Sequence, residues 1–464
     1  MRKYRNISIM LLLLTFVSGA ALAQQSNTLF HMKGLPNANE FNPAIHRDSS
    51  NLVVGLPGVS ISAGTGFAYS DLIHYGTGAL QDSLVLDFIK FHDAIDDENN
   101  VVLESAVDLF KIGVRSRSYY FSFDIRDRMV FQGSFDKGLV TFLKNGNAPY
   151  LGQNVDLGNM AFNAMHYREY GFGFSNEFLN NRLTLGVRAK ILYGKMNINV
   201  DKLNIQVETA AGGESLLLKA KGEANMAGPV TLTFDEYGFV DETNDNFDVA
   251  DYLLDNESAG YAFDIGANYK VNKKLQIGAS VIDLGSIQWS KNVYNMTQNG
   301  SYKYTGADLS QSVNDNASDY KEAGDVFEEL TDSIKHGFRI NNSSSKYNTP
   351  IPTKVYLSGS YQLTPKTDLG FLGRAYMFED NTDMSMTLSA NTLVGRWLSL
   401  TASYSVMNKT YDNLGIGVGA RLGPLQLYMV SDKILSAMKP ADANGFTFRF
   451  GINILMGRSY KRSF

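Results

Sequence analysis

The sequence contains no cysteine, and this absence excludes several classes of protein. Without a thiol there can be no zinc–thiolate site, no disulfide framework, no cysteine nucleophile and no lipid anchor on a cysteine. Proline is also scarce, with 10 residues among 464, whereas there are 42 glycines, 25 tyrosines and 28 phenylalanines. Few prolines together with many aromatic residues favour long β-strands. We predict no metal and no cofactor.

The sequence also lacks a long hydrophobic run after its first 23 residues. A spanning helix needs about 18 or more apolar residues, so a membrane protein built of helices is excluded. The mean hydropathy is slightly negative. The formal net charge of −5 disfavours binding to nucleic acid, and we predict none.

The N-terminus has the three parts of a secretory signal peptide. Arg2, Lys3 and Arg5 are positive, residues 7–17 are apolar, and Ala21-Leu22-Ala23 is a small-x-small cleavage site. The apolar stretch is too short to anchor the chain in a bilayer. We expect residues 1–23 to be a signal peptide that is cleaved after Ala23, which leaves an exported protein.

Most of the remaining sequence alternates between apolar and polar residues over stretches of about ten residues. For example, Phe446, Phe448 and Phe450 are separated by Thr447 and Arg449. This period of two places apolar and polar residues on opposite faces of a strand. Strands in soluble domains have about 5–6 residues, whereas strands that cross a bilayer need about 9–11. The lengths therefore favour a membrane barrel over a soluble β-sandwich.

The connections between these stretches support the same interpretation. The predicted strands are 52–62, 118–125, 129–134, 166–177, 183–199, 261–270, 275–287, 354–363, 368–378, 384–393, 397–407, 410–422, 425–432 and 446–456. Every second connection is short, namely 126–128, 178–182, 271–274, 364–367, 394–396 and 423–424. The long insertions are 63–117, 135–165, 200–260 and 288–353. Short turns on one side and long loops on the other are typical of outer-membrane barrels, whose turns face the periplasm.

We therefore predict an all-β fold, a transmembrane antiparallel β-barrel of about 14 strands over residues 51–457 in the cell outer membrane. The sheet must close on itself because every backbone polar group in hydrocarbon has to be paired. Residues 458–464 are expected to form a short periplasmic tail. Outer-membrane lipids would surround the barrel.

Several short segments carry a family resemblance. They are Asn37–Ile45, Val54–Gly58, Glu169–Gly173 and Asp283–Trp289. In their order, with an Asn-Pro-Ala near the mature N-terminus, they resemble the FadL-type outer-membrane barrels, a group that includes the PorV-like proteins of the Bacteroidota. The likeness is greatest to an uncharacterised Bacteroidota family, domain of unknown function 5723.

The resemblance implies that residues 24–50 fold into the barrel lumen as a hatch, with Asn42, Pro43 and Ala44 inside. A surface turn is the alternative for these three residues, since Asn-Pro favours turns.

Two sets of residues fall on predicted lumen faces. The basic set is Arg188, Lys190, Lys354, Arg374, Arg421 and Arg449. These cations could bind the carboxylate of an amphiphile, or could pair with carboxylates of the hatch and wall, such as Asp124, Glu169 and Asp264. The second set is Gly415, Gly417 and Gly419, which lack the strand-to-helix context of a phosphate loop. They could admit the hatch backbone or relieve the curvature of the barrel.

Other motifs indicate little chemistry. The acidic run in the 200–260 insertion is interpreted as a solvated loop rather than a calcium site, because its spacing does not match that of an EF-hand. It consists of Asp241, Glu242, Asp245, Asp248, Asp251 and Asp255. No Gly-x-Ser-x-Gly elbow is present, and we predict no enzymatic activity. Amphipathic helices are expected at 100–110 and 319–335.

The resemblance implies passive transport of hydrophobic or amphiphilic compounds. The alternative is a non-transporting, PorV-like docking or accessory protein in type IX secretion or surface-protein attachment. The partners would then be hydrophobic small molecules in the first case and surface or secreted proteins in the second. A continuous apolar pocket would favour transport, and a plugged lumen would favour docking.

Overall fold

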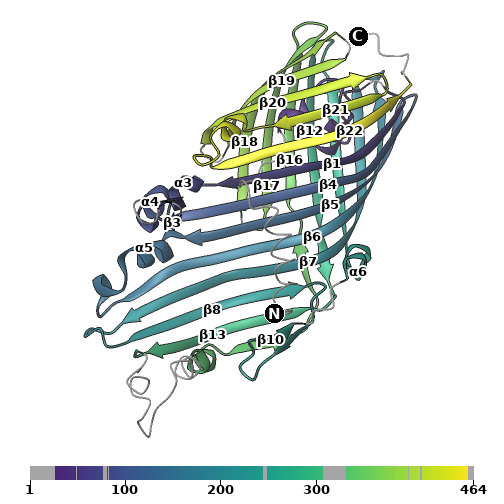
Figure 1. Cartoon of the computed structure of the whole chain (residues 1–464). Coiled ribbons are helices and arrows are strands. Elements are labelled where there is room, and N and C mark those ends of the chain that lie inside the picture. The colour runs from purple at the N-terminus through teal and green to yellow at the C-terminus, as the bar shows by residue number, and fades with distance from the viewer. Residues whose placement is uncertain are drawn as a thin grey trace.

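The computed structural model describes residues 27–48, 50–76, 81, 83–243, 248–306, 331–379, 381–395, 397–407 and 410–457, without the side chains of residues 410 and 412. The expected signal peptide and the tail at 458–464 lie outside these ranges. The described chain folds mainly into long antiparallel strands (Figure 1).

Fourteen strands form a closed ring. They are β1 (Leu52–Thr65), β4 (Glu98–Ser116), β5 (Tyr119–Asp136), β6 (Asn154–Phe178), β7 (Leu183–Thr209), β11 (Ser258–Lys270), β12 (Leu275–Trp289), β16 (Thr353–Gln362), β17 (Thr367–Phe378), β18 (Asn381–Val394), β19 (Leu398–Met407), β20 (Thr410–Leu422), β21 (Leu425–Ser431) and β22 (Gly445–Met456). Each strand pairs with the next, and β1 pairs with both β4 and β22. The predicted 14-strand barrel is confirmed.

The two faces of the wall differ as the alternation predicts. On β18, Met384, Met386 and Leu388 are 70%, 65% and 63% exposed. Their neighbours Ser385, Thr387 and Ser389 point inward and are buried. An apolar outer face is what a lipid environment requires, because hydrocarbon offers no partner for polar groups.

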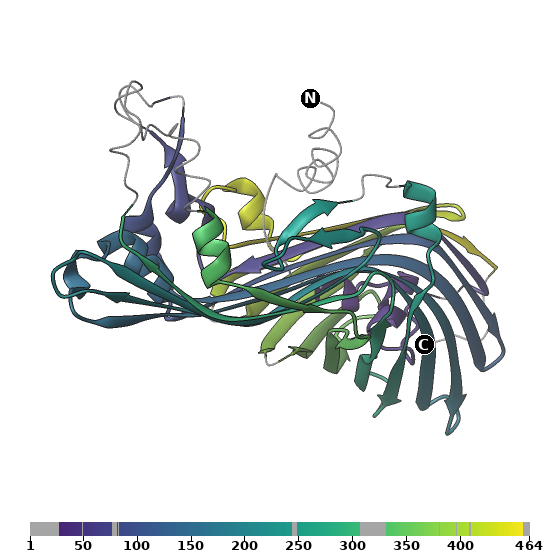
Figure 2. The same ribbon diagram turned by 90° about the horizontal axis from the view of Figure 1, so that it is seen from below.

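The wall continues beyond the ring as a curved sheet on the long-loop side (Figures 1 and 2). The strands β6 and β7 have 25 and 27 residues, far more than the ~9–11 that cross a bilayer. The distal end of β7 pairs with β8 (Leu216–Ala227), which pairs with β13 (Tyr294–Tyr304), and β13 pairs with β14 (Ile340–Ser343). We call this extension the outer sheet.

Short elements occupy the long connections. They are the helices α3 (Tyr69–Leu72), α4 (Phe88–Ala94), α5 (Lys137–Asn145), η3 (Ala148–Tyr150), α6 (Val249–Leu254) and α8 (Ile434–Met438), and the strands β2 (Ile73–Tyr75), β3 (Leu84–Leu86), β9 (Leu232–Phe234), β10 (Val240–Thr243) and β15 (Tyr347–Pro350). Among the described residues, the helices are all too short or too polar to cross a bilayer.

Two expectations about local structure are wrong. The expected helix at 100–110 lies within β4, and the expected turn at 126–128 lies in the middle of β5. The strands predicted at 118–125 and 129–134 are therefore one strand. The prediction also missed β4, so the number of strands in the ring is still 14. Charged residues in mid-strand caused both errors. Glu104 and Asp108 of β4 and Arg126 and Arg128 of β5 all face the lumen and pair with opposite charges there. The long insertions consequently contain parts of the wall.

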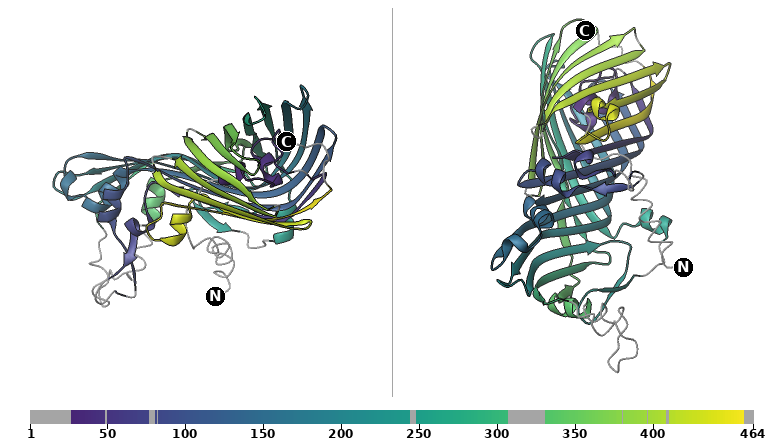
Figure 3. Two further views of the ribbon diagram at one scale, coloured as in Figure 1. Left: turned by 90° about the horizontal axis from the view of Figure 1, so that it is seen from above. Right: turned by 60° about the vertical axis from the view of Figure 1, so that its left-hand side comes forward.

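The N-terminal segment lies inside the ring (Figure 3). It contains the helices α2 (Asn27–Phe30) and η1 (Pro36–Glu40), and it joins β1 at the short-turn end of the barrel. We call the described residues 27–48 and 50 the hatch. Nearly all of them are buried.

Candidate functional site

An apolar core joins the hatch to one side of the wall. Leu29, Phe30, Met32 and Leu35 are completely buried. The ring of Phe30 stacks on the ring of Tyr356 with 6.1 Å between their centroids. Complete burial of such side chains stabilises the docked state by roughly 1.5–3 kcal/mol each. The hatch is therefore firmly seated.

Polar contacts fix the two ends of this core. At the long-loop end, the carboxylate of Asp432 accepts hydrogen bonds from the backbone N–H groups of Asn27 and Thr28, both at 2.8 Å. These are the first amides of α2, which otherwise have no partner within the helix. At the short-turn end, the amide of Gln426 donates to the carbonyl oxygen of Gly34 at 2.9 Å.

The Asn42-Pro43-Ala44 segment lies in the lumen against β7, β11 and β12. The side-chain amide of Asn42 donates to the carbonyl oxygens of Ala267 and Ala279, both at 3.1 Å. A Cβ atom at Gly186 would come within 2.5 Å of the Pro43 carbonyl group. The Asn-Pro turn is thus a lumenal contact of the hatch, and glycine in the wall makes room for it.

The glycine row of β20 faces the hatch as well. A Cβ atom at Gly417 would lie 2.6 Å from the sulfur of Met32, and one at Gly419 would lie 2.9 Å from Leu35. Gly415 contacts Thr28 in the same way. Of the two interpretations of this row, close approach of the hatch is therefore the one that matches these contacts.

A connected network of buried charges crosses the middle of the lumen. Its cations are Lys111, Arg126, Arg128, Arg188, Lys190, Lys354 and Arg449, and its carboxylates are Glu40, Glu104, Asp108, Asp124, Glu169, Asp264 and Asp283. Seven cations thus face seven carboxylates, of which six belong to the wall and one, Glu40, to the hatch. We call this set the lumen ion network.

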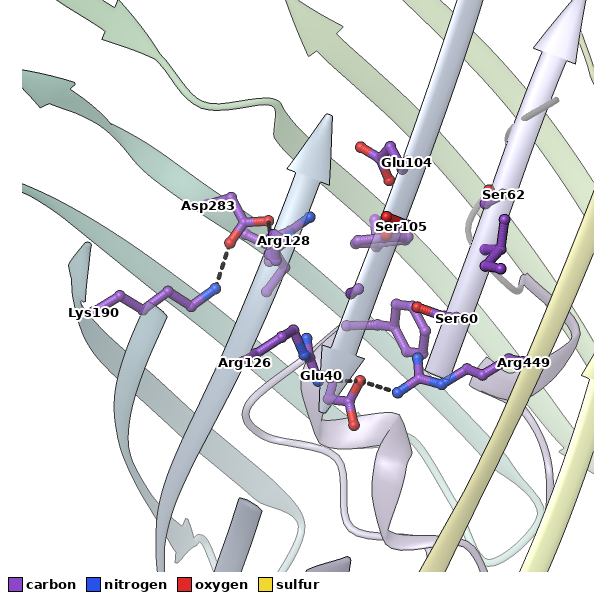
Figure 4. Close-up of a pocket in the computed structure, with 15 residues that line it drawn as sticks. Glu40, Ser60, Ser62, Glu104, Ser105, Arg126, Arg128, Lys190, Asp283 and Arg449 are labelled. Atoms are coloured by element: carbon purple, nitrogen blue, oxygen red, sulfur yellow. Dashed lines mark hydrogen bonds and ion pairs between the residues drawn. The ribbon is translucent and has the colours of Figure 1, made fainter. Parts of the chain in front are cut away.

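Glu40 joins the hatch to three strands, and Figure 4 shows it beside two of its partners, Arg126 and Arg449. Its Oε2 lies 2.6 Å from Arg449 on β22 and 2.8 Å from Arg126 on β5, and its Oε1 lies 3.3 Å from Lys111 on β4. Burial opposes ionisation of Glu40. Even so, the facing Arg126, Arg449 and Lys111 outweigh this effect and hold the pKa of Glu40 well below its ordinary value.

Asp283 is the other centre of the network. It sits in an irregularity of the β12 pairing with a φ of 63°, a conformation that L-residues adopt rarely. Its carboxylate contacts Arg128 at 2.7 Å, Lys354 at 3.1 Å and Lys190, and Figure 4 shows Lys190 reaching it from β7. Its backbone N–H donates to Asp264 at 2.8 Å. The surrounding contacts hold this strained position in place.

The structure thus places Arg188, Lys190, Lys354 and Arg449 in the lumen ion network, each paired with wall or hatch carboxylates. Arg374 is also buried, and its Nε has no hydrogen-bond partner among the described residues. Arg421 differs, since it donates to the carbonyl oxygens of Gly423 and Leu455 at the short-turn end.

Sequence reasoning missed half of the network, most importantly Glu40, Lys111, Arg126 and Asp283. Asp283 interrupts the alternation of its strand, and Glu40 lies in a segment without periodicity. A signal was available on β5, where Asp124, Arg126 and Arg128 keep the period of two and share one face.

A small cavity of about 50 Å³ adjoins Glu40. Ser60, Ser62, Ser105, Arg126 and Arg449 contribute to its lining. A water molecule takes about 30 Å³ in the liquid, so the cavity has room for one or two. The Nε of Arg449 and the hydroxyl of Ser62 are buried without hydrogen-bond partners among the described residues. The site is therefore polar, small and incompletely satisfied.

The acidic loop does not gather around one point in its described part. Asp248 accepts hydrogen bonds from the first amides of α6, and Asp255 pairs with Lys291 at 2.9 Å. Within the described ranges, the acidic, histidine and cysteine side chains form no group that could hold a metal ion.

Comparison with known proteins supplies the family. The model of a family of unknown function, DUF5723, matches residues 43–432. The chain belongs to the DUF5723 family. This match confirms the resemblance to that family, while a Bacteroidota source stays a prediction. No curated protein matches this DUF5723 sequence.

Among solved structures, this DUF5723 chain is similar to a Pseudomonas aeruginosa FadL homologue, with 11% identity, a TM-score of 0.40, and coverage of 94% of this chain and 100% of that chain. It is also similar to the Pseudomonas putida toluene transporter TodX, with 9% identity, a TM-score of 0.38, and coverage of 94% and 97%.

Proposed function

We propose that this DUF5723 protein is a gated outer-membrane barrel for passive passage of amphiphilic compounds, with the hatch as its gate. The observation that carries the proposal is that the wall closes without the hatch. The ring is completed by β1 pairing with β22, whereas residues 27–45 meet the wall through side-chain contacts and isolated hydrogen bonds. A segment held in this way can move without breaking the sheet.

The chemistry of the lumen favours amphiphilic over purely hydrophobic compounds. The lumen ion network and the serine and asparagine side chains of β18 and β19 present charge and hydrogen-bonding groups to anything inside. An alkane or arene would desolvate these groups without replacing their contacts, which costs free energy. A compound with a polar head could replace some of them. The filled lumen means that passage requires movement of the hatch.

The absence of cysteine allows a direct test. The hydroxyl oxygens of Thr28 on the hatch and Ser403 on β19 lie 2.6 Å apart, so the pair Thr28→Cys with Ser403→Cys brings two thiols together in a cysteine-free chain. Cells that produce only this double variant would be assayed for uptake of an alkyl carboxylate and an alkanol of equal length.

We expect uptake of the carboxylate to stop when the pair is oxidised and to return on reduction. The two single-cysteine variants are the matched controls and should be insensitive to redox state. Equal uptake in the oxidised and reduced double variant would rule out the hatch as a gate.

Docking is the second candidate, and two observations favour it. In the described chain, the lumen is filled rather than lined by a continuous apolar pocket, which is the feature expected of a docking protein, and the outer sheet extends beyond the ring. The sheet carries β8, β13 and β14 beyond the ring, and closure of the barrel does not need these strands. A partner in type IX secretion or surface-protein attachment would find a large platform there. In a deletion strain, loss of surface-protein secretion with normal uptake would support docking over passage.

A further inference from the structure

We propose that Lys111, Arg126 and Arg449 form a carboxylate-binding site of the barrel wall, and that Glu40 fills it as a tethered ligand that a free carboxylate can replace. The role of such an exchange in releasing the hatch rests on the proposed function. The site itself does not, and it can be tested in purified protein.

The first argument is geometric. Three cations from β4, β5 and β22 converge on one carboxylate, with Arg449 and Arg126 sharing its Oε2 at 2.6 and 2.8 Å. The amide of Asn37 donates to its Oε1 at 2.9 Å. Charge-assisted contacts of this kind are short and directional, and they recognise a carboxylate whichever chain carries it. All three cations belong to the wall, so the site stays in place when the hatch moves.

The second argument is charge balance. Without Glu40, seven cations of the network face six carboxylates, and Lys111 loses the only ion pair that it makes within the described ranges. A buried cation without a partner is strongly unfavourable. Departure of Glu40 therefore leaves one uncompensated cation in the wall, which an incoming anion can neutralise. One missing negative charge matches a monocarboxylate.

The third argument is the unused donor capacity beside Glu40. The cavity of about 50 Å³ has room for a group of one or two water volumes. Arg449 and Ser62 line it, and the Nε of Arg449 and the hydroxyl of Ser62 have no partner in the described chain. A carboxylate can thus approach Arg449 before Glu40 has left. The ligand class is a small carboxylate, or a longer molecule that ends in one.

The experiment measures how often the hatch is exposed. Ala38 is completely buried in η1, and Ala38→Cys places one thiol there in a cysteine-free chain. The rate of maleimide labelling of the purified, refolded barrel then reports hatch release. We expect the added change Glu40→Ala to raise this rate at least tenfold. Formate at about 0.1 M should restore slow labelling, and chloride at equal ionic strength should not.

The matched control is Glu208→Ala, which removes a carboxylate from an exposed ion pair with Lys219 at 3.1 Å on the outer sheet. It should change neither the labelling rate nor its response to formate. If Glu40→Ala does not yield folded barrel, Glu40→Gln keeps the side-chain volume. Formate can then reach Arg449 through the cavity, and the same difference from chloride is expected.

A separate measurement tests the exchange of Glu40 for a free carboxylate. With Glu40 intact, octanoate below its micellar concentration should accelerate labelling of the Ala38→Cys variant at least threefold over octanol. Equal effects of formate and chloride on the Glu40 variants would overturn the site. Rescue by formate without acceleration by octanoate would overturn the exchange. Neither result depends on uptake, so the cysteine-pair experiment can fail while this one succeeds.

Discussion

Replacing Asp283 with Asn is the sharpest test of the lumen ion network. The amide keeps the size of the side chain, and Asn tolerates the positive φ of 63° as well as Asp does. The substitution therefore removes one buried negative charge without adding backbone strain. The three cations around it, Arg128, Lys190 and Lys354, then depend on other carboxylates.

The expected loss of unfolding free energy depends on the ion pairs that remain after the substitution. Breaking a buried pair by removing one partner costs about 3–5 kcal/mol. After the substitution, Arg128 still faces Glu169 at 3.4 Å, Lys190 faces Asp264 at 2.9 Å and Lys354 faces Glu104 at 3.7 Å. Because no cation is left alone, we expect the lower end, about 3 kcal/mol of lost unfolding free energy.

The assay is guanidinium unfolding of the folded barrel, followed by tryptophan fluorescence. Of the two tryptophans, Trp289 is completely buried in the same strand as Asp283. The control is Glu208→Gln, which breaks the outer-sheet pair with Lys219 at 3.1 Å, whose two side chains are 48% and 41% exposed. For an exposed pair of this kind, a loss of about 1 kcal/mol or less is expected. Equal losses in the two variants, or a loss below about 0.5 kcal/mol for Asp283→Asn, would refute the reasoning.

Three further predictions concern the hatch. The first concerns Glu40, whose pKa is depressed in the folded state. Its contribution to stability is therefore present above its ordinary pKa of about 4.5 and is lost as the pH falls through the folded value. The guanidinium midpoint of unfolding should drop over that window, and the drop should be smaller in Glu40→Gln. Burial, with Arg47 nearby, lowers the pKa of His31 well below 6.5. The unfolded chain therefore takes up a proton first, and stability should fall as the pH drops below about 6.5. His31→Gln should remove this part of the pH dependence of the guanidinium midpoint, and an unchanged pH dependence would contradict the prediction. Gly417→Val places a side chain where a Cβ atom would lie only 2.6 Å from the Met32 sulfur. Maleimide labelling of the Ala38→Cys variant should therefore accelerate while the barrel stays folded. The control is Gly359→Ala, whose Cβ atom would make only an ordinary contact at 4.0 Å.

Residue patterns were sufficient to predict the barrel. Alternation with a period of two is a local property, and lipid outside and a polar lumen inside impose it on every strand. Prediction from the local pattern failed on β5, where Arg126, Asp127 and Arg128 together resemble a turn. Charges are expected at turns, and only the carboxylates of other segments make them acceptable in mid-strand.

In the hatch, too, some features could be predicted from the sequence and others could not. The resemblance led us to expect Asn42, Pro43 and Ala44 in the lumen, and the structure places them there against β7, β11 and β12. It could not indicate that Glu40 is the residue that completes the charge balance of the wall. Glu40 and Arg449 are separated by 409 positions, and no local pattern relates them.

The alternating pattern alone is enough to specify the strands, their inward and outward faces and the need for closure, because these follow from pairing every backbone group in hydrocarbon. The pairing of charges inside the lumen depends on strands far apart in the chain meeting at one height. That meeting is set by register and by the packing of the hatch, so only the tertiary structure decides which carboxylate neutralises which cation.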